Sequence, residues 1–131
     1  MIGLDTNVLI RYLMKDDIKQ FNLAEKVVES AIKRKNLMHI SLVVLCEVVW
    51  VLNYTYELKR EEIAKFLDKL LHAEYIEIEN RQLALTAFHE YRHTKADFAD
   101  CVIGLINLSF SCTTTYTFDK KAAKLAFFTA L

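Results

Sequence analysis

Proline is absent from the sequence, and glycine occurs only twice among its 131 residues. This scarcity argues against a disordered chain and against an all-β fold with many tight turns. The sequence also has no excess of either charge, since 17 lysines and arginines balance 17 aspartates and glutamates. Any contact with nucleic acid must therefore depend on a local patch rather than on the charge of the whole chain.

Long hydrophobic runs and paired cysteines are missing too. The longest apolar run, Val48–Leu52 and its neighbours, is interrupted by polar residues and is too short to cross a membrane. No basic segment followed by an apolar one opens the sequence, so we expect no signal peptide. Three cysteines without CxxC spacing are expected to be reduced, buried thiols of a cytoplasmic protein. They are Cys46, Cys101 and Cys112.

Short apolar runs alternate with longer stretches of helical period, within a length that fits one domain. The expected strands are Ile2–Leu4, Leu37–Ile40, Tyr75–Ile78 and Thr113–Thr117. The expected helices are Val8–Met14, Leu23–Arg34, Leu42–Tyr54, Glu61–His72, Leu83–His93, Phe98–Phe110 and Lys120–Phe127. Strands that alternate with helices need crossover connections. The pattern therefore predicts an α/β fold, a three-layer sandwich with a mainly parallel central sheet and helices on both faces.

Acidic residues stand where the predicted strands give way to helices. Asp5 follows the first predicted strand directly, and Asp119 follows the last one. Such junctions gather at the carboxyl edge of a parallel sheet, so these two carboxylates are expected to meet there. Asp97 and Asp100 are three residues apart and share one helix face. The alternative is that each aspartate is an ordinary helix N-cap, and Asp97-x-x-Asp100 does resemble a capping box.

Glu47 lies inside an apolar predicted helix. Its neighbours at three and four residues are Val43, Val44, Trp50 and Val51, and no cation is within helical reach. Burying a lone carboxylate is costly, so a metal ion would supply the missing charge; the alternative is a place at a groove rim in contact with water. A cluster of oxygen ligands favours Mg²⁺ or Mn²⁺ over zinc. Such ions bind phosphates and activate water for phosphodiester cleavage.

Four segments in this order and spacing make the chain similar to a known family. They are Met1–Asn7, Ser41–Leu52, Ala96–Gly104 and Thr117–Asp119. Together they resemble the PIN-domain family and, within it, the VapC toxins. The resemblance covers essentially the whole chain and implies a single PIN-like nuclease domain over residues 1–131.

The resemblance also implies a set of site residues. The implied catalytic residues and metal ligands are Asp5, Glu47, Asp100 and Asp119. The implied accessory residues are Asp97, Thr6, Asn7 and Thr117. The first strand should be central in the sheet. Relatives often have a glycine within the segment that is Lys124–Phe128 here, so the sequence leaves the place of the last strand open.

The activity implied by the resemblance is that of an Mg²⁺- or Mn²⁺-dependent endoribonuclease. It would be the cytoplasmic toxin of a type II toxin–antitoxin pair, with RNA as substrate. The resemblance further implies a homodimer that is neutralised by a cognate antitoxin. Operator DNA would be bound only through the complex with that antitoxin.

Two other functions fit parts of the sequence. His89, Glu90 and His93 match the H-E-x-x-H signature of a zinc metallopeptidase. Arg92 and the absence of a later glutamate as third ligand weaken that hypothesis, and the alternative is a pair of exposed histidines. A non-catalytic metal-binding receiver-like module would need a phosphorylatable aspartate after the third strand, where Glu79 follows instead.

Side chains that could contact RNA are less clearly marked. Trp50, Tyr54 and Tyr56 could stack bases, with packing in the core or at an interface as the alternative. Cations close in sequence to the acids are candidates for phosphate contacts. They are Arg11, Lys95, Lys120 and Lys121.

Overall fold

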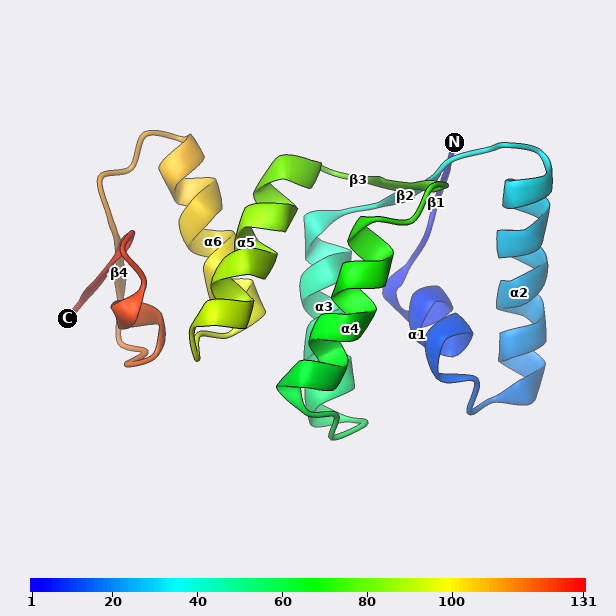
Figure 1. Cartoon of the computed structure of the whole chain (residues 1–131), viewed down its shortest axis with the longest axis horizontal. Helices are drawn as coiled ribbons and strands as arrows, with labels where there is room; N and C mark the ends of the chain where they lie inside the picture. The colour runs from blue at the N-terminus through cyan, green and yellow to red at the C-terminus, as the bar shows by residue number, and fades with distance from the viewer. The chain divides into compact units, whose positions relative to one another are not determined.

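Parallel strands and helices alternate along the chain in the computed structural model, which describes residues 1–131. The chain divides into two units, Met1–Glu79 and Asn80–Leu131, each with its own helices and its own small sheet (Figure 1). The predicted α/β fold with parallel strand pairing is confirmed in both units. No helix has the length and apolar character needed to cross a membrane.

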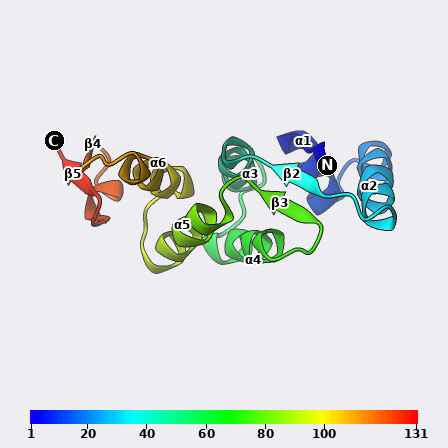
Figure 2. The same ribbon diagram turned by 90° about the horizontal axis from the view of Figure 1, so that it is seen from above.

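The first unit contains a three-stranded parallel sheet and four helices. In chain order its elements are β1 (Ile2–Gly3), α1 (Thr6–Met14), α2 (Ile18–Lys33), β2 (Met38–Ile40), α3 (Leu42–Tyr54), α4 (Arg60–Leu71) and β3 (Ile76–Ile78). The strand order is β1-β2-β3, and Figure 2 shows β2 and β3 side by side. The expectation of a central first strand is wrong for this sheet, because β2 lies between β1 and β3.

The strands of the first unit place alternate side chains on opposite faces of the sheet. Ile40 of β2 and Ile78 of β3 are paired in register and buried. Between the buried residues, His39 is half-buried and Glu77 is exposed. This alternation fixes the register, since a slip of one residue would expose the buried isoleucines.

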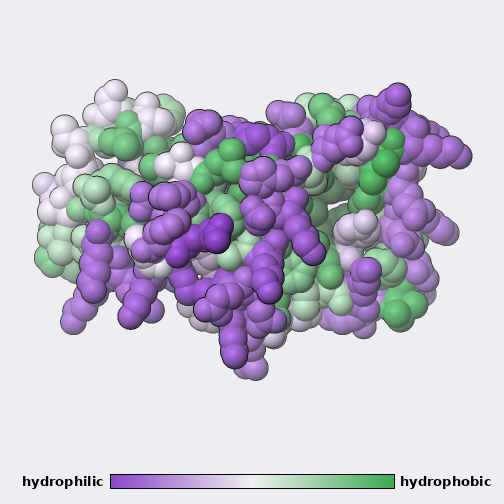
Figure 3. Space-filling view, in the orientation of Figure 1, coloured by the Kyte–Doolittle hydropathy of each residue, from purple (hydrophilic) through white to green (hydrophobic).

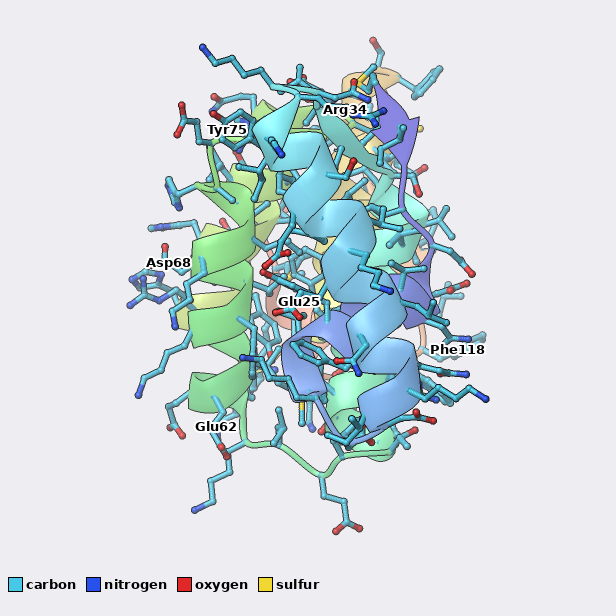
Figure 4. All side chains as sticks on the ribbon, turned by 90° about the vertical axis from the view of Figure 1, so that its right-hand side faces the viewer. Glu25, Arg34, Glu62, Asp68, Tyr75 and Phe118 are labelled. Atoms are coloured by element: carbon cyan, nitrogen blue, oxygen red, sulfur yellow. The ribbon has the colours of Figure 1, made fainter.

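Helix α3 forms because its apolar residues have helical spacing and because a capping residue stands directly before its first turn. The Ser41 hydroxyl accepts a hydrogen bond from the Val44 amide at 3.2 Å, which satisfies one of the free amides of the first turn. The buried residues recur every three or four positions. They are Leu42, Leu45, Val48, Val49 and Leu52. In α4 the same spacing buries Ile63 and Leu67, while Glu62 and Asp68 project outward (Figure 4).

The second unit contains two helices and a two-stranded parallel sheet. Its elements are α5 (Arg81–His93), α6 (Phe98–Ser109), β4 (Thr115–Thr117), the 3-10 turn η1 (Ala122–Lys124) and β5 (Phe128–Ala130). Helices α5 and α6 pack through Tyr91 and Phe98, whose rings meet edge to face with centroids 5.9 Å apart. Gly104 of α6 lies so close to the Phe127 and Phe128 rings that a Cβ there would collide with both.

The predicted helix Lys120–Phe127 is wrong. Only the single turn η1 forms, and Leu125 is already extended, with φ −72° and ψ 141°. The chain then pairs as β5 with β4, where Thr115 faces Phe128 and Thr117 faces Ala130. Pairing satisfies backbone groups along β4 that a helix would leave unpaired, which outweighs the local helical pattern. The other predicted helices and strands are present with ends shifted by a few residues.

Candidate metal centre

Three aspartates of the second unit form an acidic cluster. Oxygens of Asp97, Asp100 and Asp119 all lie within 4.8 Å of one another. Asp97 is the N-cap residue of α6, Asp100 is in the first turn of α6, and Asp119 follows β4. The predicted pairing of Asp97 with Asp100 on one helix face is therefore confirmed, and the turn after β4 adds Asp119 to them.

The helix-cap alternative for these acids can be tested by their hydrogen bonds. Asp97 and Asp5 occupy N-cap positions, but neither carboxylate makes a capping hydrogen bond. Asp119 differs, because its Oδ1 accepts hydrogen bonds from the amides of Lys121 and Ala122, both at 2.8 Å. Asp5 and Asp97 thus keep their carboxylates free of capping bonds, whereas Asp119 binds the two amides at the start of η1 through one of its two oxygens.

The environment of Asp100 opposes its negative charge. Partial burial raises the pKa of the Asp100 carboxyl, and the neighbouring charges of Asp119 and Asp97 raise it further. Asp100 is half-buried, whereas Asp97 and Asp119 are exposed. A divalent cation among the three carboxylates would offset both the repulsion and the desolvation. The donor set, carboxylate oxygen alone, fits Mg²⁺ or Mn²⁺.

Thr117 holds the turn that carries Asp119. Its hydroxyl oxygen accepts a hydrogen bond from the Asp119 amide at 2.9 Å. Phe118, between them, is 86% exposed and is labelled in Figure 4. Thr117, one of the accessory residues that the resemblance implies, thus stabilises the turn before Asp119.

The first unit holds the other two acids named from the sequence. Asp5 begins α1, and Glu47 lies midway along α3. The Thr6 hydroxyl donates a hydrogen bond of 2.6 Å to Glu47 Oε2, across 41 positions of sequence. Thr6 is only 5% exposed, so this bond fixes one oxygen of Glu47 and joins α1 to α3. Asn7 follows on α1 and lines a shallow pocket of about 320 Å³ with Arg11.

The argument that burial forces a counter-ion on Glu47 is wrong, because Glu47 is exposed on α3. Of the apolar neighbours that suggested burial, Val43 and Trp50 are exposed, and Val44 and Val51 are half-buried. Cys46 beside it is partly buried, and burial together with the Glu47 carboxylate raises the pKa of its thiol to about 11. Glu47 therefore has the environment of the second alternative, a carboxylate in contact with water.

Arg11 has partners that the sequence did not reveal. Its Nη1 donates a hydrogen bond to the Tyr56 hydroxyl at 3.1 Å and lies 3.8 Å from Asp16. The Tyr56 hydroxyl in turn donates to Asp16 at 2.8 Å, and this bond lowers the pKa of the Asp16 carboxyl. Tyr56 and Asp16 are 40 positions apart, so no local pattern could have indicated the contact. Arg11 is consequently engaged within the first unit.

The metallopeptidase signature lies on the surface of α5. His89 and His93 are both exposed, with ring centroids 4.2 Å apart. His93 Nδ1 lies 2.8 Å from the His89 carbonyl oxygen, as in an ordinary helix surface contact. The group of metal-binding side chains that the structure brings together consists of the three aspartates and not of these histidines.

Comparison with known proteins identifies the class to which the fold and the acids belong. Residues 2–128 match the PIN domain, so this chain belongs to the PIN-domain family. The chain is also similar to a VapC ribonuclease of Aquifex aeolicus (strain VF5), with 24% identity over 124 residues. That match covers 95% of this chain and 91% of the relative. The resemblance read from the four sequence segments is confirmed, and PIN domains generally depend on divalent metals, which the acidic cluster could hold.

Proposed function

We propose that the chain is an endoribonuclease that uses Mg²⁺ or Mn²⁺ and acts as the toxin of a type II toxin–antitoxin pair. The observation that carries the proposal is the cluster of Asp97, Asp100 and Asp119 in a chain of the PIN-domain family. The similarity to a protein named VapC ribonuclease supports RNA as the substrate.

We propose that residues 1–131 form a single nuclease domain. Asp5, Glu47, Asp100 and Asp119 would be the catalytic residues and metal ligands, and Asp97 an accessory acid. When bound, the metal supplies positive charge to the cleaved phosphate and lowers the pKa of the attacking water. The match of residues 2–128 to the PIN domain supports a single nuclease domain.

The chain's own hydrogen bonds prepare two of these carboxylates. The Thr6 hydroxyl donates a hydrogen bond to Glu47 Oε2. The amides that follow Asp119 donate hydrogen bonds to Asp119 Oδ1. Each carboxylate is thus held by one oxygen and can offer the other to a cation. Because the protein orients both groups before the metal binds, less conformational entropy is lost on binding. Thr6 and Thr117 act as positioning residues, and Asn7, next to Thr6 on α1, is placed with them.

The partners follow from the same proposal. The chain would be a cytoplasmic homodimer, neutralised by a cognate antitoxin whose complex binds operator DNA. The large apolar side chains left exposed on the surface support such contacts, and Figure 3 shows apolar patches between hydrophilic side chains. Expression of the chain alone should arrest growth, and co-expression of the antitoxin should lift the arrest. Growth at the normal rate with active enzyme present would contradict the toxin role.

The nuclease activity is tested with the purified chain and single-stranded RNA. Cleavage should require added Mg²⁺ or Mn²⁺ and should stop when EDTA is present. Glu90→Gln should cleave as the unaltered chain does, because Glu90 belongs to the peptidase signature. Cleavage that persists in EDTA, or that needs zinc and Glu90, would contradict the proposal.

A further inference from the structure

Helix α3 presents an exposed stripe that the core does not use. Val43, Glu47, Trp50 and Tyr54 follow one another at intervals of four, three and four residues, so they share one helix face. Val43 is 66% exposed, Trp50 59% and Tyr54 63%, and Glu47 is exposed among them. Other faces of α3 supply its buried residues. The two large rings therefore contribute little to folding.

The two rings form a continuous aromatic surface. The centroids of Trp50 and Tyr54 are 5.2 Å apart, with their planes inclined at 35°. At this spacing no base fits between them, but their outward faces remain open. An α-helix rises 1.5 Å per residue, so Trp50 lies roughly 4.5 Å from Glu47 along the helix axis. Tyr54 lies roughly 10 Å from Glu47 along the same axis. The surface thus starts one helical turn from an acid of the proposed metal site.

The Glu47 carboxylate, in the middle of the stripe, indicates which kind of partner could cover the two rings. A dry protein interface over Trp50 and Tyr54 would also remove the Glu47 carboxylate from water, and α3 has no lysine or arginine to compensate it. A strand of nucleic acid can leave Glu47 in water, and a divalent cation bound by that carboxylate would offset its repulsion of the phosphates. Its bases stack on the rings while its phosphates stay in water with the cations that Glu47 attracts. Aromatic surfaces of this kind stack unpaired bases, which are available in single strands and loops.

We propose that Trp50 and Tyr54 form a stacking surface for an unpaired RNA base next to the cleaved phosphate. The proposal rests on the proposed ribonuclease function and adds specificity-determining residues to it. Both rings would favour single-stranded RNA over a duplex, whose bases are already stacked. Because every base has a flat face, this contact would select unpaired structure rather than a particular base.

The single tryptophan of the chain makes the proposal directly measurable. The fluorescence of Trp50 is recorded in Asp5→Asn protein, which should not cleave, as a short single-stranded oligoribonucleotide is added. A gel confirms that the oligonucleotide stays intact. Stacking should quench the emission, and an oligonucleotide of the same length with abasic sugars should bind more weakly and quench little. Equal quenching by both would mean that the backbone, and not a base, is what reaches Trp50.

Matched variants distinguish the contribution of an aromatic ring to RNA binding from that of apolar surface alone. Tyr54→Leu and Trp50→Leu keep apolar surface without a ring, and should weaken binding of the base-containing oligonucleotide about tenfold, the usual effect of losing one stacked base. Tyr54→Phe and Trp50→Phe keep a ring and should bind within about twofold of the parent. Thermal melting checks folding, which exposed positions should preserve. If a leucine variant melts early, the abasic comparison in the parent chain still decides the matter.

The outcomes distinguish this proposal from the function on which it rests. If the unaltered chain cleaves RNA but both leucine variants bind and cleave equally well, the stacking surface is wrong and the nuclease stands. If the unaltered chain cleaves no RNA with Mg²⁺, the function itself fails. If Trp50 emission changes on dilution, and Trp50→Leu turns a dimer into a monomer with unchanged RNA affinity, the stripe is instead a contact between two copies.

Discussion

At the scale of single residues, the most informative side chain is Asp100. Its pKa is raised by burial and by the charges of Asp119 and Asp97, so the folded protein holds a proton there more readily than the unfolded chain does. A carboxyl whose folded pKa is raised costs stability at neutral pH, and the cost disappears as pH falls through that pKa. The charge that would serve a metal site therefore works against the metal-free fold.

Asp100→Asn should raise the melting temperature of the metal-free protein at neutral pH, because it removes the repelled charge at nearly constant volume. The advantage over the unaltered chain should shrink as pH is lowered toward the titration of Asp100. Added Mg²⁺ should raise the melting temperature of the unaltered chain more than that of the variant. Calorimetry over a range of pH, with and without EDTA, checks all three expectations.

The matched control is Glu29→Gln, which removes one charge from an exposed position of α2 outside the cluster. It should change neither the pH dependence nor the response to Mg²⁺. A marked fall in the melting temperature of Asp100→Asn would show that Asp100 stabilises α6 as an ordinary first-turn acid.

The three cysteines should differ in reactivity. The expectation that all three are buried is wrong for Cys112, which is exposed near the end of α6. Cys46 is partly buried, with its pKa raised to about 11, and Cys101 is buried. Only the thiolate reacts, and at about pH 8 roughly a thousandth of Cys46 would be in that form. Alkylation followed by mass spectrometry should label Cys112 first, Cys46 slowly and Cys101 only on unfolding. Early labelling of Cys46 would contradict the burial assigned to it.

The structure brings Asp97, Asp100 and Asp119 together, whereas the burial expected of Glu47 is wrong. The positions of Asp97 and Asp100 follow from spacing along one helix, which is a local property. The exposure of Glu47 depends on which face of an almost wholly apolar helix packs against the core, and spacing alone does not decide this. The Thr6–Glu47 hydrogen bond spans 41 positions, so only the folded chain could reveal it.

At the scale of elements, the predicted and observed bounds agree best where a helix has both a capping residue and a regular apolar spacing. Helix α3 spans Leu42–Tyr54 as predicted, because Ser41 caps an unbroken apolar stretch. Lys120–Phe127 was mispredicted because its helical pattern is overridden by pairing of β5 with β4. The strand partner lies outside any local window, which is the usual reason why such segments are misread.

The contact of α6 with the last strand gives a stability prediction. Gly104→Ala adds a methyl group where the Phe127 and Phe128 rings already lie, so it should lower the free energy of unfolding by about 1–3 kcal/mol through overpacking. Urea denaturation measures the loss. If the methyl group met no ring, Gly104→Ala would instead raise the free energy of unfolding by up to about 1 kcal/mol, because alanine favours a helix more than glycine does.

Gly3→Ala serves as the control, since a Cβ at Gly3 meets nothing within 4 Å. It should change the free energy of unfolding by less than about 0.5 kcal/mol, as surface substitutions do. Equal effects at the two glycines would mean that the close approach of Phe127 and Phe128 to α6 is not maintained in solution.

At the scale of the whole molecule, composition and alternation were enough to predict an α/β chain with parallel strands. They could not predict that the acids are divided between two units, with Asp5 and Glu47 in the first and three aspartates in the second. The match to the PIN-domain family extends over both units. The central proposal is therefore that the chain is a metal-dependent ribonuclease that needs its acidic residues.

That proposal is tested most directly by single substitutions in the RNA cleavage assay with Mg²⁺. Asp5→Asn and Asp119→Asn, one from each unit, should each reduce cleavage at least about 100-fold, since even indirect support of a metal ligand is worth about 10–100-fold. Glu29→Gln, which removes an exposed charge from α2, should cleave as the unaltered chain does. An Asp5→Asn or Asp119→Asn variant that cleaves at the original rate would contradict the proposal.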